Sequence, residues 1–274
     1  MVFTNSAPFL LQGFTQSENV NVYSSKGMSQ DGKNYLGNTL DVMDITLEVA
    51  LIGSTEEELI ILRNKTNKVF NPKNNEGWLI YKDNVKERKV KCILNKIPLF
   101  VDVNSSVSEG LISLTANNPY WLDMLESKKE VALWIGSFEF PLELVAGGIE
   151  MGYREPSTIV NVFNQGDTEC GLRVELKALA TVVNPSLLNV NTGEYIKINK
   201  TMVVGETINV TTYFGNKKVE STILEITTNI FNYIDFNSTF LQLDVQDNVF
   251  KYDAETGIDN LEVSIYYQPQ YLGV

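Results

Sequence analysis

The chain has 274 residues, of which 43% are hydrophobic and 20% are charged, and its formal net charge is −12. This length exceeds that of a usual single domain, and the composition is that of a globular protein, so we expect two domains. An acidic chain repels phosphate backbones, and no run of about 18 apolar residues is present, so neither nucleic acid nor a membrane is an expected partner. Residues 1–8 lack a basic segment and an apolar core, so no secretory signal is expected.

The chain contains no histidine and two cysteines, Cys92 and Cys170. The lack of histidine removes the commonest general base, the commonest metal ligand and every Ser-His or Cys-His catalytic arrangement. Two cysteines form neither a disulfide framework nor a zinc site, and we expect both to pack as small apolar residues. Because no phosphate loop, CxxC, HExxH or EF-hand pattern occurs either, we predict no catalytic, cofactor-binding or metal-binding residues and no enzymatic activity.

Strand patterns open the chain. Residues 20–23 alternate between apolar and polar, and the Asp31-Gly32 pair that follows favours a tight turn. Residues 40–52 alternate at greater length and end at Gly53. This is the clearest strand of the sequence.

A single long helix is predicted next. Thr55 can cap it, Glu58 three residues later completes a capping box, and the acidic triplet at residues 56–58 favours the positive end of the helix dipole. Asn71-Pro72 ends the helix. An apolar stripe at helical spacing consists of Leu59, Leu62, Thr66 and Val69. A metal-binding or acid–base role for the triplet is the weaker alternative, since capping and the dipole explain it.

Short strands complete the first half. Residues 77–81 and 88–94 form a predicted hairpin, residues 97–100 continue as an edge segment, and residues 111–115 close the domain. One helix laid against these strands gives an α+β domain, which we expect to be a β-barrel or β-sandwich with one helix.

The stretch Asn118-Pro119-Tyr120-Trp121 is interpreted as the domain boundary. Pro119 cannot continue a strand, and the two aromatic residues suit a domain edge. Residues 1–125 carry 12 Lys/Arg and 14 Asp/Glu, a net charge of −2, whereas residues 126–274 carry 10 and 20, a net charge of −10. We therefore predict domains at residues 1–125 and 126–274. The alternative is a strand and turn inside one domain.

The second half consists of short β runs separated by turn residues. Such spacing predicts a jelly-roll-like β-sandwich, so the whole chain is expected to be mainly β. The predicted runs cover residues 131–135, 138–144, 158–163, 170–180, 195–198, 207–213, 247–252 and 261–267.

Sandwiches of this kind can bind carbohydrate, and the second half contains aromatic residues suited to stacking on sugars. These are Tyr213, Phe214, Tyr266, Tyr267 and Tyr271. Alternation along strands favours a second interpretation, in which they fill the core or seal its edges. A glycosidase built on paired carboxylates is a weaker alternative, because no pair lies beside aromatic residues in a way that marks a sugar cleft.

The order and spacing of several short motifs resemble the distal tail protein family of long-tailed bacteriophages. In the first half these motifs are Gln30-Asp31-Gly32, the alternating residues 45–53 before a capped helix, Gly77-Trp78-Leu79-Ile80-Tyr81, the hairpin at residues 90–98, and Asn118-Pro119-Tyr120-Trp121. In the second half they are residues 161–167, Asn184-Pro185, Asn191-Thr192-Gly193-Glu194, residues 205–210, residues 263–267 and Tyr271-Leu272-Gly273. The family often has an arginine entering the strand at residue 45, where this chain has Asp44, so any ring contact made by that arginine is in doubt.

The resemblance implies a structural virion protein of a phage tail tip or baseplate. Domain 1–125 would form a hexameric ring that joins the tail tube protein to the tail-tip hub protein. Domain 126–274, a galectin-like or carbohydrate-module-like sandwich, would project outward and support receptor-binding proteins or contact host sugars. The protein would be made in the host bacterial cytoplasm. The alternative function is a non-catalytic carbohydrate-binding module that recognises the host cell surface.

Overall fold

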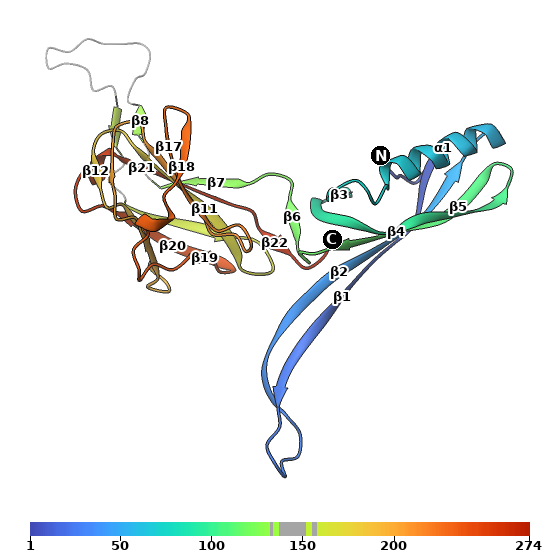
Figure 1. Cartoon of the computed structure of the whole chain (residues 1–274), viewed down its shortest axis with the longest axis horizontal. Helices are drawn as coiled ribbons and strands as arrows, with labels where there is room; N and C mark the ends of the chain where they lie inside the picture. The colour runs from blue at the N-terminus through green and yellow to red at the C-terminus, as the bar shows by residue number, and fades with distance from the viewer. Residues whose placement is uncertain (132–133, 137–151, 155–157) are drawn as a thin grey trace. The chain divides into compact units, whose positions relative to one another are not determined.

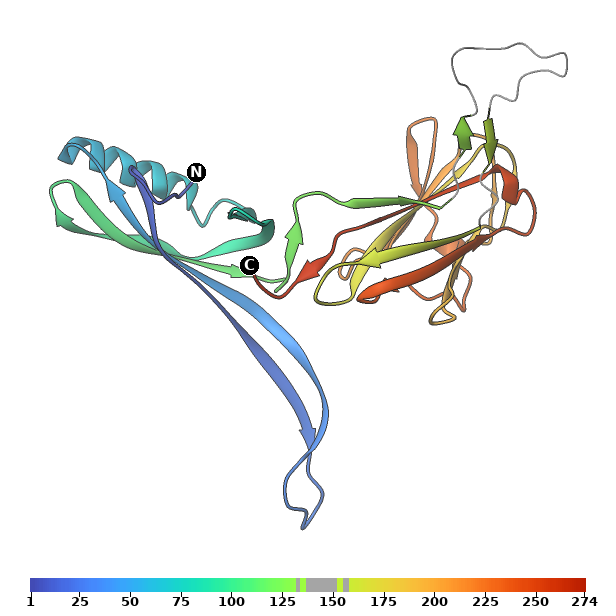
Figure 2. The same ribbon diagram turned by 180° about the vertical axis from the view of Figure 1, so that it is seen from behind.

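The computed structural model describes residues 1–131, 134–136, 152–154 and 158–274, and the chain divides into two compact units (Figures 1 and 2). The first unit comprises Met1–Leu122 together with Leu272–Val274, and the second comprises Asp123–Tyr271. The sequence prediction places the boundary after residue 125, whereas the first unit ends at Leu122 and regains the last three residues of the chain. The predicted run at residues 138–144 lies outside the described residues.

The first unit is built on one curled antiparallel sheet with a helix on one face (Figure 1). The strands follow the order β1-β2-β5-β4-β6, and β3 pairs with β4. The elements are β1 (Phe9–Ser25), β2 (Asn34–Ile52), α1 (Glu56–Val69), β3 (Gly77–Lys82), β4 (Glu87–Asn104), β5 (Val107–Ala116) and β6 (Trp121–Asp123). The two segments predicted at residues 88–94 and 97–100 belong to one strand, β4, whose register against β5 shifts between Lys96 and Leu99.

The predicted cap and stripe of α1 are largely confirmed. Thr55 is the N-cap, and its side chain accepts a hydrogen bond from the Glu58 N–H at 3.2 Å. Glu58 Oε2 reaches back to the Ser54 N–H at 2.8 Å, one residue before the cap itself. Leu59, Leu62 and Thr66 are buried against the sheet, but Val69 in the last turn is exposed. The helix therefore packs through three of the four predicted positions.

Replacing Thr55 with Ala should destabilise the first unit by about 1 kcal/mol, because the N–H group of Glu58 loses its acceptor. Glu57→Gln removes only an interaction with the helix dipole and should change the free energy of unfolding much less. Thermal unfolding of the two variants checks this. Equal losses would contradict the assignment of Thr55 as the cap.

The second unit is a β-sandwich whose larger sheet has the order β18-β17-β16-β11-β21-β7, with β19 beside β11. The facing sheet has the order β10-β20-β13-β14. The elements of the larger sheet are β7 (Ser127–Glu130), β11 (Cys170–Ala178), β16 (Thr207–Thr211), β17 (Lys218–Ile223), β18 (Ile226–Asn229), β19 (Gln242–Leu243) and β21 (Leu261–Tyr267). The facing sheet contains β10 (Ile159–Asn164), β13 (Ser186–Asn189), β14 (Tyr195–Lys197) and β20 (Gln246–Asp253).

Short strands and 3₁₀ helices complete the second unit, of which β22 is the last element along the chain. They are β8 (Trp134–Gly136), β9 (Gly152–Arg154), β12 (Val182–Val183), β15 (Thr201–Met202), η1 (Phe231–Tyr233), η2 (Ile258–Asn260) and β22 (Gln270–Tyr271). Of the predicted run at residues 131–135, Trp134 and Ile135 lie in β8, whereas Val131 lies outside a strand.

The core of the second unit is one continuous apolar cluster between its two sheets. Alternate residues of β11, such as Leu172, Val174 and Leu176, point inward from the larger sheet. Phe250 and Tyr252 of β20 face them from the smaller sheet. This burial on alternate positions is what the period of a strand dictates. The predicted mainly β fold class, with a helix-bearing first domain and a sandwich after it, is confirmed.

Candidate assembly surfaces

One face of the first sheet is covered by α1, and the opposite face carries exposed apolar residues. Phe100 packs toward the helix with Phe9 and Leu59. The alternate positions of β4 therefore point away from the helix, and Leu111 of β5 lies directly opposite Leu99. We call this set the β4 stripe; its members, each 55–75% exposed, are Ile97, Leu99, Val101, Val103 and Leu111. A sheet face of this composition is typical of a surface that another protein covers.

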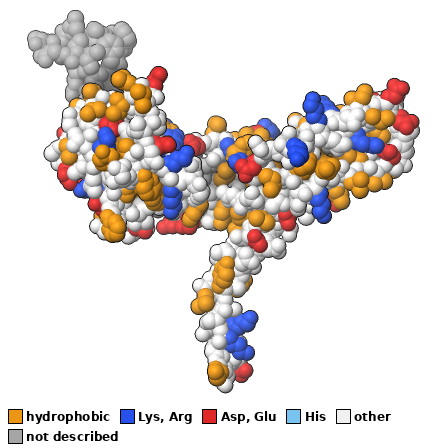
Figure 3. Space-filling view, in the orientation of Figure 1, with side chains coloured by type: hydrophobic (Ala, Val, Ile, Leu, Met, Phe, Trp, Pro, Cys, Tyr) orange, Lys and Arg blue, Asp and Glu red, His pale blue; other side chains and the backbone are white. Residues whose placement is uncertain are grey.

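A second unpartnered surface lies on the long hairpin formed by β1 and β2. Its outer part, residues 18–42, extends as a two-stranded ribbon, and we call it the hairpin arm (Figures 1 and 3). Gly32 has the positive φ, +79°, that the Asp31-Gly32 pair favours, but the connection at the end of this arm spans residues 26–33 and is longer than the tight turn expected from the sequence. Exposed apolar side chains of the arm are Val20, Val22, Tyr23, Met28, Tyr35, Leu36 and Val42, and Lys26 and Lys33 are the basic residues near its turn. An isolated ribbon is marginally stable in water, so the arm is suited to contact with a partner.

The groups that could carry chemistry are few in the described part of the chain. No group of three or more His, Cys, Asp or Glu residues there is placed to hold a metal ion. Both cysteines are buried free thiols; burial raises the pKa of Cys92 and raises the pKa of Cys170 to about 12, so neither is a ready nucleophile. None of the described helices is long and apolar enough to span a bilayer.

The aromatic residues considered for sugar stacking are mostly engaged in the fold. Tyr271 is buried, and the hydroxyl of Tyr267 donates to the Phe163 carbonyl at 3.0 Å. The hydroxyl of Tyr213 donates to a Glu126 carboxylate oxygen at 3.2 Å, and burial raises the pKa of Tyr213. The guanidinium of Arg173 lies 3.8 Å from the centre of the Tyr266 ring. Of the five, only Phe214 is largely exposed, at 75%. The sealing interpretation therefore holds for the other four.

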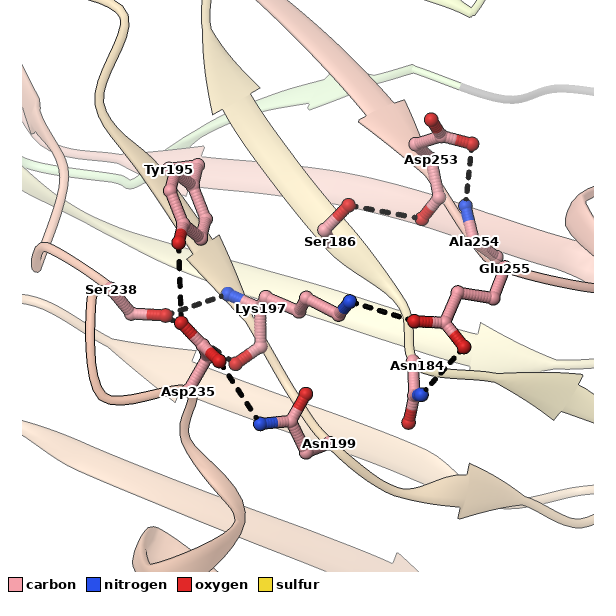
Figure 4. A network of polar contacts seen from close by, with 10 residues as sticks. All are labelled: Asn184, Ser186, Tyr195, Lys197, Asn199, Asp235, Ser238, Asp253, Ala254 and Glu255. Carbon is pink, nitrogen blue, oxygen red and sulfur yellow. Dashed lines mark hydrogen bonds and ion pairs between the residues drawn. The ribbon is translucent and has the colours of Figure 1, made fainter.

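A polar network in the second unit covers the outer edge of β14 (Figure 4). The N–H groups of Asp235 and Thr239 donate to the carbonyls of Lys197 and Tyr195, at 2.9 and 2.8 Å. The Asp235 carboxylate accepts from the Asn199 amide and the Tyr195 hydroxyl, each at 3.2 Å. The Asn199 hydrogen bond is the main reason that the pKa of Asp235 is lowered. The loop at residues 235–239 thus closes this sheet edge, and the Asp235 carboxylate is held by Tyr195 and Asn199.

Asp44, which stands where the family often has an arginine, is exposed on β2. Its Oδ1 accepts a hydrogen bond from the Thr115 hydroxyl at 2.7 Å, across the pair formed by β2 and β5. The side chain is therefore held within its own unit. As a carboxylate, it cannot make the contact that an arginine makes through its positive charge.

Comparison with known proteins identifies both halves of the chain. Residues 1–116 match the family model described as phage tail protein RIFT-related domain. Residues 165–271 match the model described as siphovirus-type tail component, C-terminal domain. No curated protein sequence is similar enough to the chain to count as a match.

Solved structures of phage tail components share the fold. The crystal structure of the SPP1 Dit (gp 19.1) protein, described as a paradigm of the hub adsorption apparatus in phages infecting Gram-positive bacteria, superposes with a TM-score of 0.69 at 11% identity, covering 96% of this chain and 94% of that chain. A chain of the phage p2 baseplate, in its activated conformation with Sr, gives a TM-score of 0.53 at 10% identity, covering 98% and 93%. Because the two family models match residues 1–116 and 165–271, the protein belongs to the distal tail protein family of long-tailed bacteriophages and is a phage tail component.

Proposed function

We propose that the protein forms a homohexameric ring that joins the tail tube protein to the tail-tip hub protein. The observation that carries this proposal is the β4 stripe, because a ring requires each copy to cover an exposed surface of its neighbour. The hairpin arm supplies a second surface of the same kind on the same unit. Membership of the distal tail protein family supports the position in the virion.

The charge distribution supports a ring formed by the first unit. Residues 1–125 have a net charge of −2, so six copies can crowd around an axis with little mutual repulsion. Residues 126–274 have a net charge of −10, which is tolerable at larger radius, where salt screens charges beyond about 10 Å. In this arrangement the second unit faces outward and supports host-attachment proteins. The protein is made in the host cytoplasm and acts without catalysis.

A carbohydrate-binding role is the less favoured candidate. Of the five aromatic residues that suggested it, Tyr271 is buried in the fold, and Tyr213 and Tyr267 use their hydroxyl groups in internal hydrogen bonds. Sugar stacking needs exposed ring faces, so these residues give the second unit little of what such a site requires.

The ring is tested on the full-length protein by native mass spectrometry. The unchanged chain should give a six-copy species, whereas the double variant Leu99→Asp, Val101→Asp should give monomers, because two carboxylates would have to be desolvated in the interface. Both positions are exposed, so the variant should retain the thermal unfolding temperature of the original chain.

Phe236→Asp is the matched control, since it places a carboxylate at a fully exposed apolar position of the second unit. This variant should assemble as the unchanged chain does. If the double variant still forms a hexamer, the β4 stripe is not part of the ring interface. A chain that stays monomeric at every concentration would contradict the ring itself.

A further inference from the structure

The larger sheet of the second unit ends in the hairpin β17–β18, drawn in orange in Figures 1 and 2. The Ile230 N–H donates to the Val219 carbonyl at 2.9 Å, so the backbone groups of Ile230 point toward β17. Thr228 lies two residues earlier, and its backbone groups point the same way. Antiparallel strands alternate, and Thr227 and Asn229 therefore direct their N–H and C=O groups to the other side. Among the strands of the described part of the chain, only β17 pairs with β18. The edge is open for pairing.

Two other sheet edges of the second unit are blocked, and this one is not. At the opposite end of the same sheet, β7 carries Lys128, Lys129 and Glu130 within four residues. In the facing sheet, the edge of β14 is covered by the loop at residues 235–239. Charge and coverage are the usual means by which proteins prevent strand addition. The residues of β18 are Ile226, Thr227, Thr228 and Asn229, all exposed and none charged.

The turn of this hairpin provides an independent observation. Leu224 and Glu225 both have positive φ values, +46° and +67°, in a two-residue turn where Asn-Gly is the favoured pair. The Leu224 side chain is 90% exposed and that of Ile226 is 69% exposed. A bulky residue in a left-handed conformation strains the backbone, and its exposed apolar side chain is poorly solvated. Neither feature stabilises the isolated protein. A surface that is strained and apolar in this way points to a binding role.

We propose that an extended segment of another tail-tip protein adds to the edge of β18 and covers Leu224 and Ile226. Backbone hydrogen bonds to Thr227 and Asn229 would supply the affinity, and the apolar tip would supply the selectivity. Glu220 and Glu225 lie beside the edge, so the added segment is neutral or basic and carries an apolar residue opposite the tip. The proposal rests on the proposed function, since it places the partner in the tail tip.

A second copy of this chain is the less suitable occupant. Pairing two four-residue edges buries much less than the roughly 1,200 Å² of a stable dimer interface. A partner that contacts several copies of the ring at once would bind through several such edges, and their combined affinity would retain it.

Hydrogen exchange of the full-length protein, alone and in purified phage tails, tests the proposal. The amides of Thr227 and Asn229 should exchange roughly 100-fold more slowly in tails than in the free chain. Tails that contain the chain with both amides still exchanging freely would overturn the inference and leave the proposed function intact. Tails that lack the chain would overturn both.

Two variants identify the occupant. Thr227→Lys places a charge on the open edge, so the protection of Thr227 and Asn229 in tails should be lost. The variant tails should also lack one protein component, which is the occupant of the edge. Thr222→Lys is the matched control, because Thr222 pairs with Thr227 across the hairpin and their hydroxyls lie 2.9 Å apart, but it lies one strand inside the edge. Tails with Thr222→Lys should retain both the amide protection and that protein component. Protection that develops in the free chain with rising concentration would instead assign the edge to a second copy and overturn the proposal.

The double variant Leu224→Asn, Glu225→Gly separates binding from folding. It installs the favoured turn pair, so the second unit should unfold at a higher temperature while the protection of Thr227 and Asn229 in tails decreases. A purely structural hairpin would gain stability and keep that protection, which would count against the proposal.

Discussion

Replacing Trp121 with Ala is expected to lower the free energy of unfolding of the first unit by about 3–5 kcal/mol. Trp121 is fully buried, and its ring lies 6.3 Å from the ring of Phe14 and 6.4 Å from that of Tyr81. Its indole N–H donates to the Gln16 side-chain oxygen at 3.0 Å, and the Gln16 amide in turn donates to the Leu272 carbonyl at 2.7 Å. The substitution would leave a large cavity and an unsatisfied acceptor, so this should be the most damaging single change in the unit.

Trp78→Ala is the control for this prediction. Trp78 is half-exposed on β3, with the Lys89 amine 5.1 Å from its ring centre, and its loss should cost about 1 kcal/mol or less. Trp121→Phe keeps an aromatic ring but loses the hydrogen bond, and it should lie between the two. Calorimetric unfolding of the three variants measures the order. Equal effects of Trp78→Ala and Trp121→Ala would show that Trp121 is not the centre of this packing.

Local sequence signals predicted those elements whose stability depends on near neighbours. Thr55, Glu58 and the buried face of α1 could be predicted because capping and helical spacing act within a few residues. Residues 40–52 could be predicted as a strand because one face is buried throughout, from Met43 to Leu51. The continuity of β4 could not, because Pro98 ordinarily ends a strand and here lies where the register shifts.

The candidate surfaces were harder to predict than the elements that carry them. The pattern of Leu99, Val101 and Val103 is that of any half-buried strand, and only the position of α1 on the opposite face shows that this set lies outside the core. Likewise, β17 and β18 were missing from the predicted strands, because their turn residues, Leu224 and Glu225, are not turn formers. Turn propensity fails where the native conformation is strained.

Glu206→Gln is expected to destabilise the second unit by about 2–4 kcal/mol, because it breaks a buried ion pair. Glu206 has no exposed surface, and its Oε1 accepts from the Lys200 amine and the Ser221 hydroxyl, each at 2.5 Å. Its Oε2 accepts from the Val203 N–H at 3.1 Å, which closes the turn before β16. The amide of Gln cannot accept these three bonds in the same geometry, and the Lys200 charge, largely shielded from water, would lose its partner.

The pH dependence distinguishes this ion pair from ordinary packing. Burial alone would raise the pKa of Glu206, but the hydrogen bonds from Lys200, Ser221 and Val203 lower it below its usual value of 4.5. A folded-state pKa below the unfolded one means that this carboxylate stabilises the unit fully above pH 4.5 and that the stabilisation is lost as the pH falls through the folded-state value. The difference in unfolding free energy between the original chain and Glu206→Gln should therefore be constant near neutral pH and decrease below pH 4.5.

The exposed pair of Lys177 and Glu262, 2.9 Å apart on neighbouring strands of the larger sheet, is the control for Glu206→Gln. Glu262→Gln should cost at most about 1 kcal/mol, since water and salt screen this pair. Urea unfolding of both variants across the acidic range provides the measurement. If the loss from Glu206→Gln is as small as that from Glu262→Gln, or is unchanged at acidic pH, then the turn before β16 is held by packing and not by the buried charge.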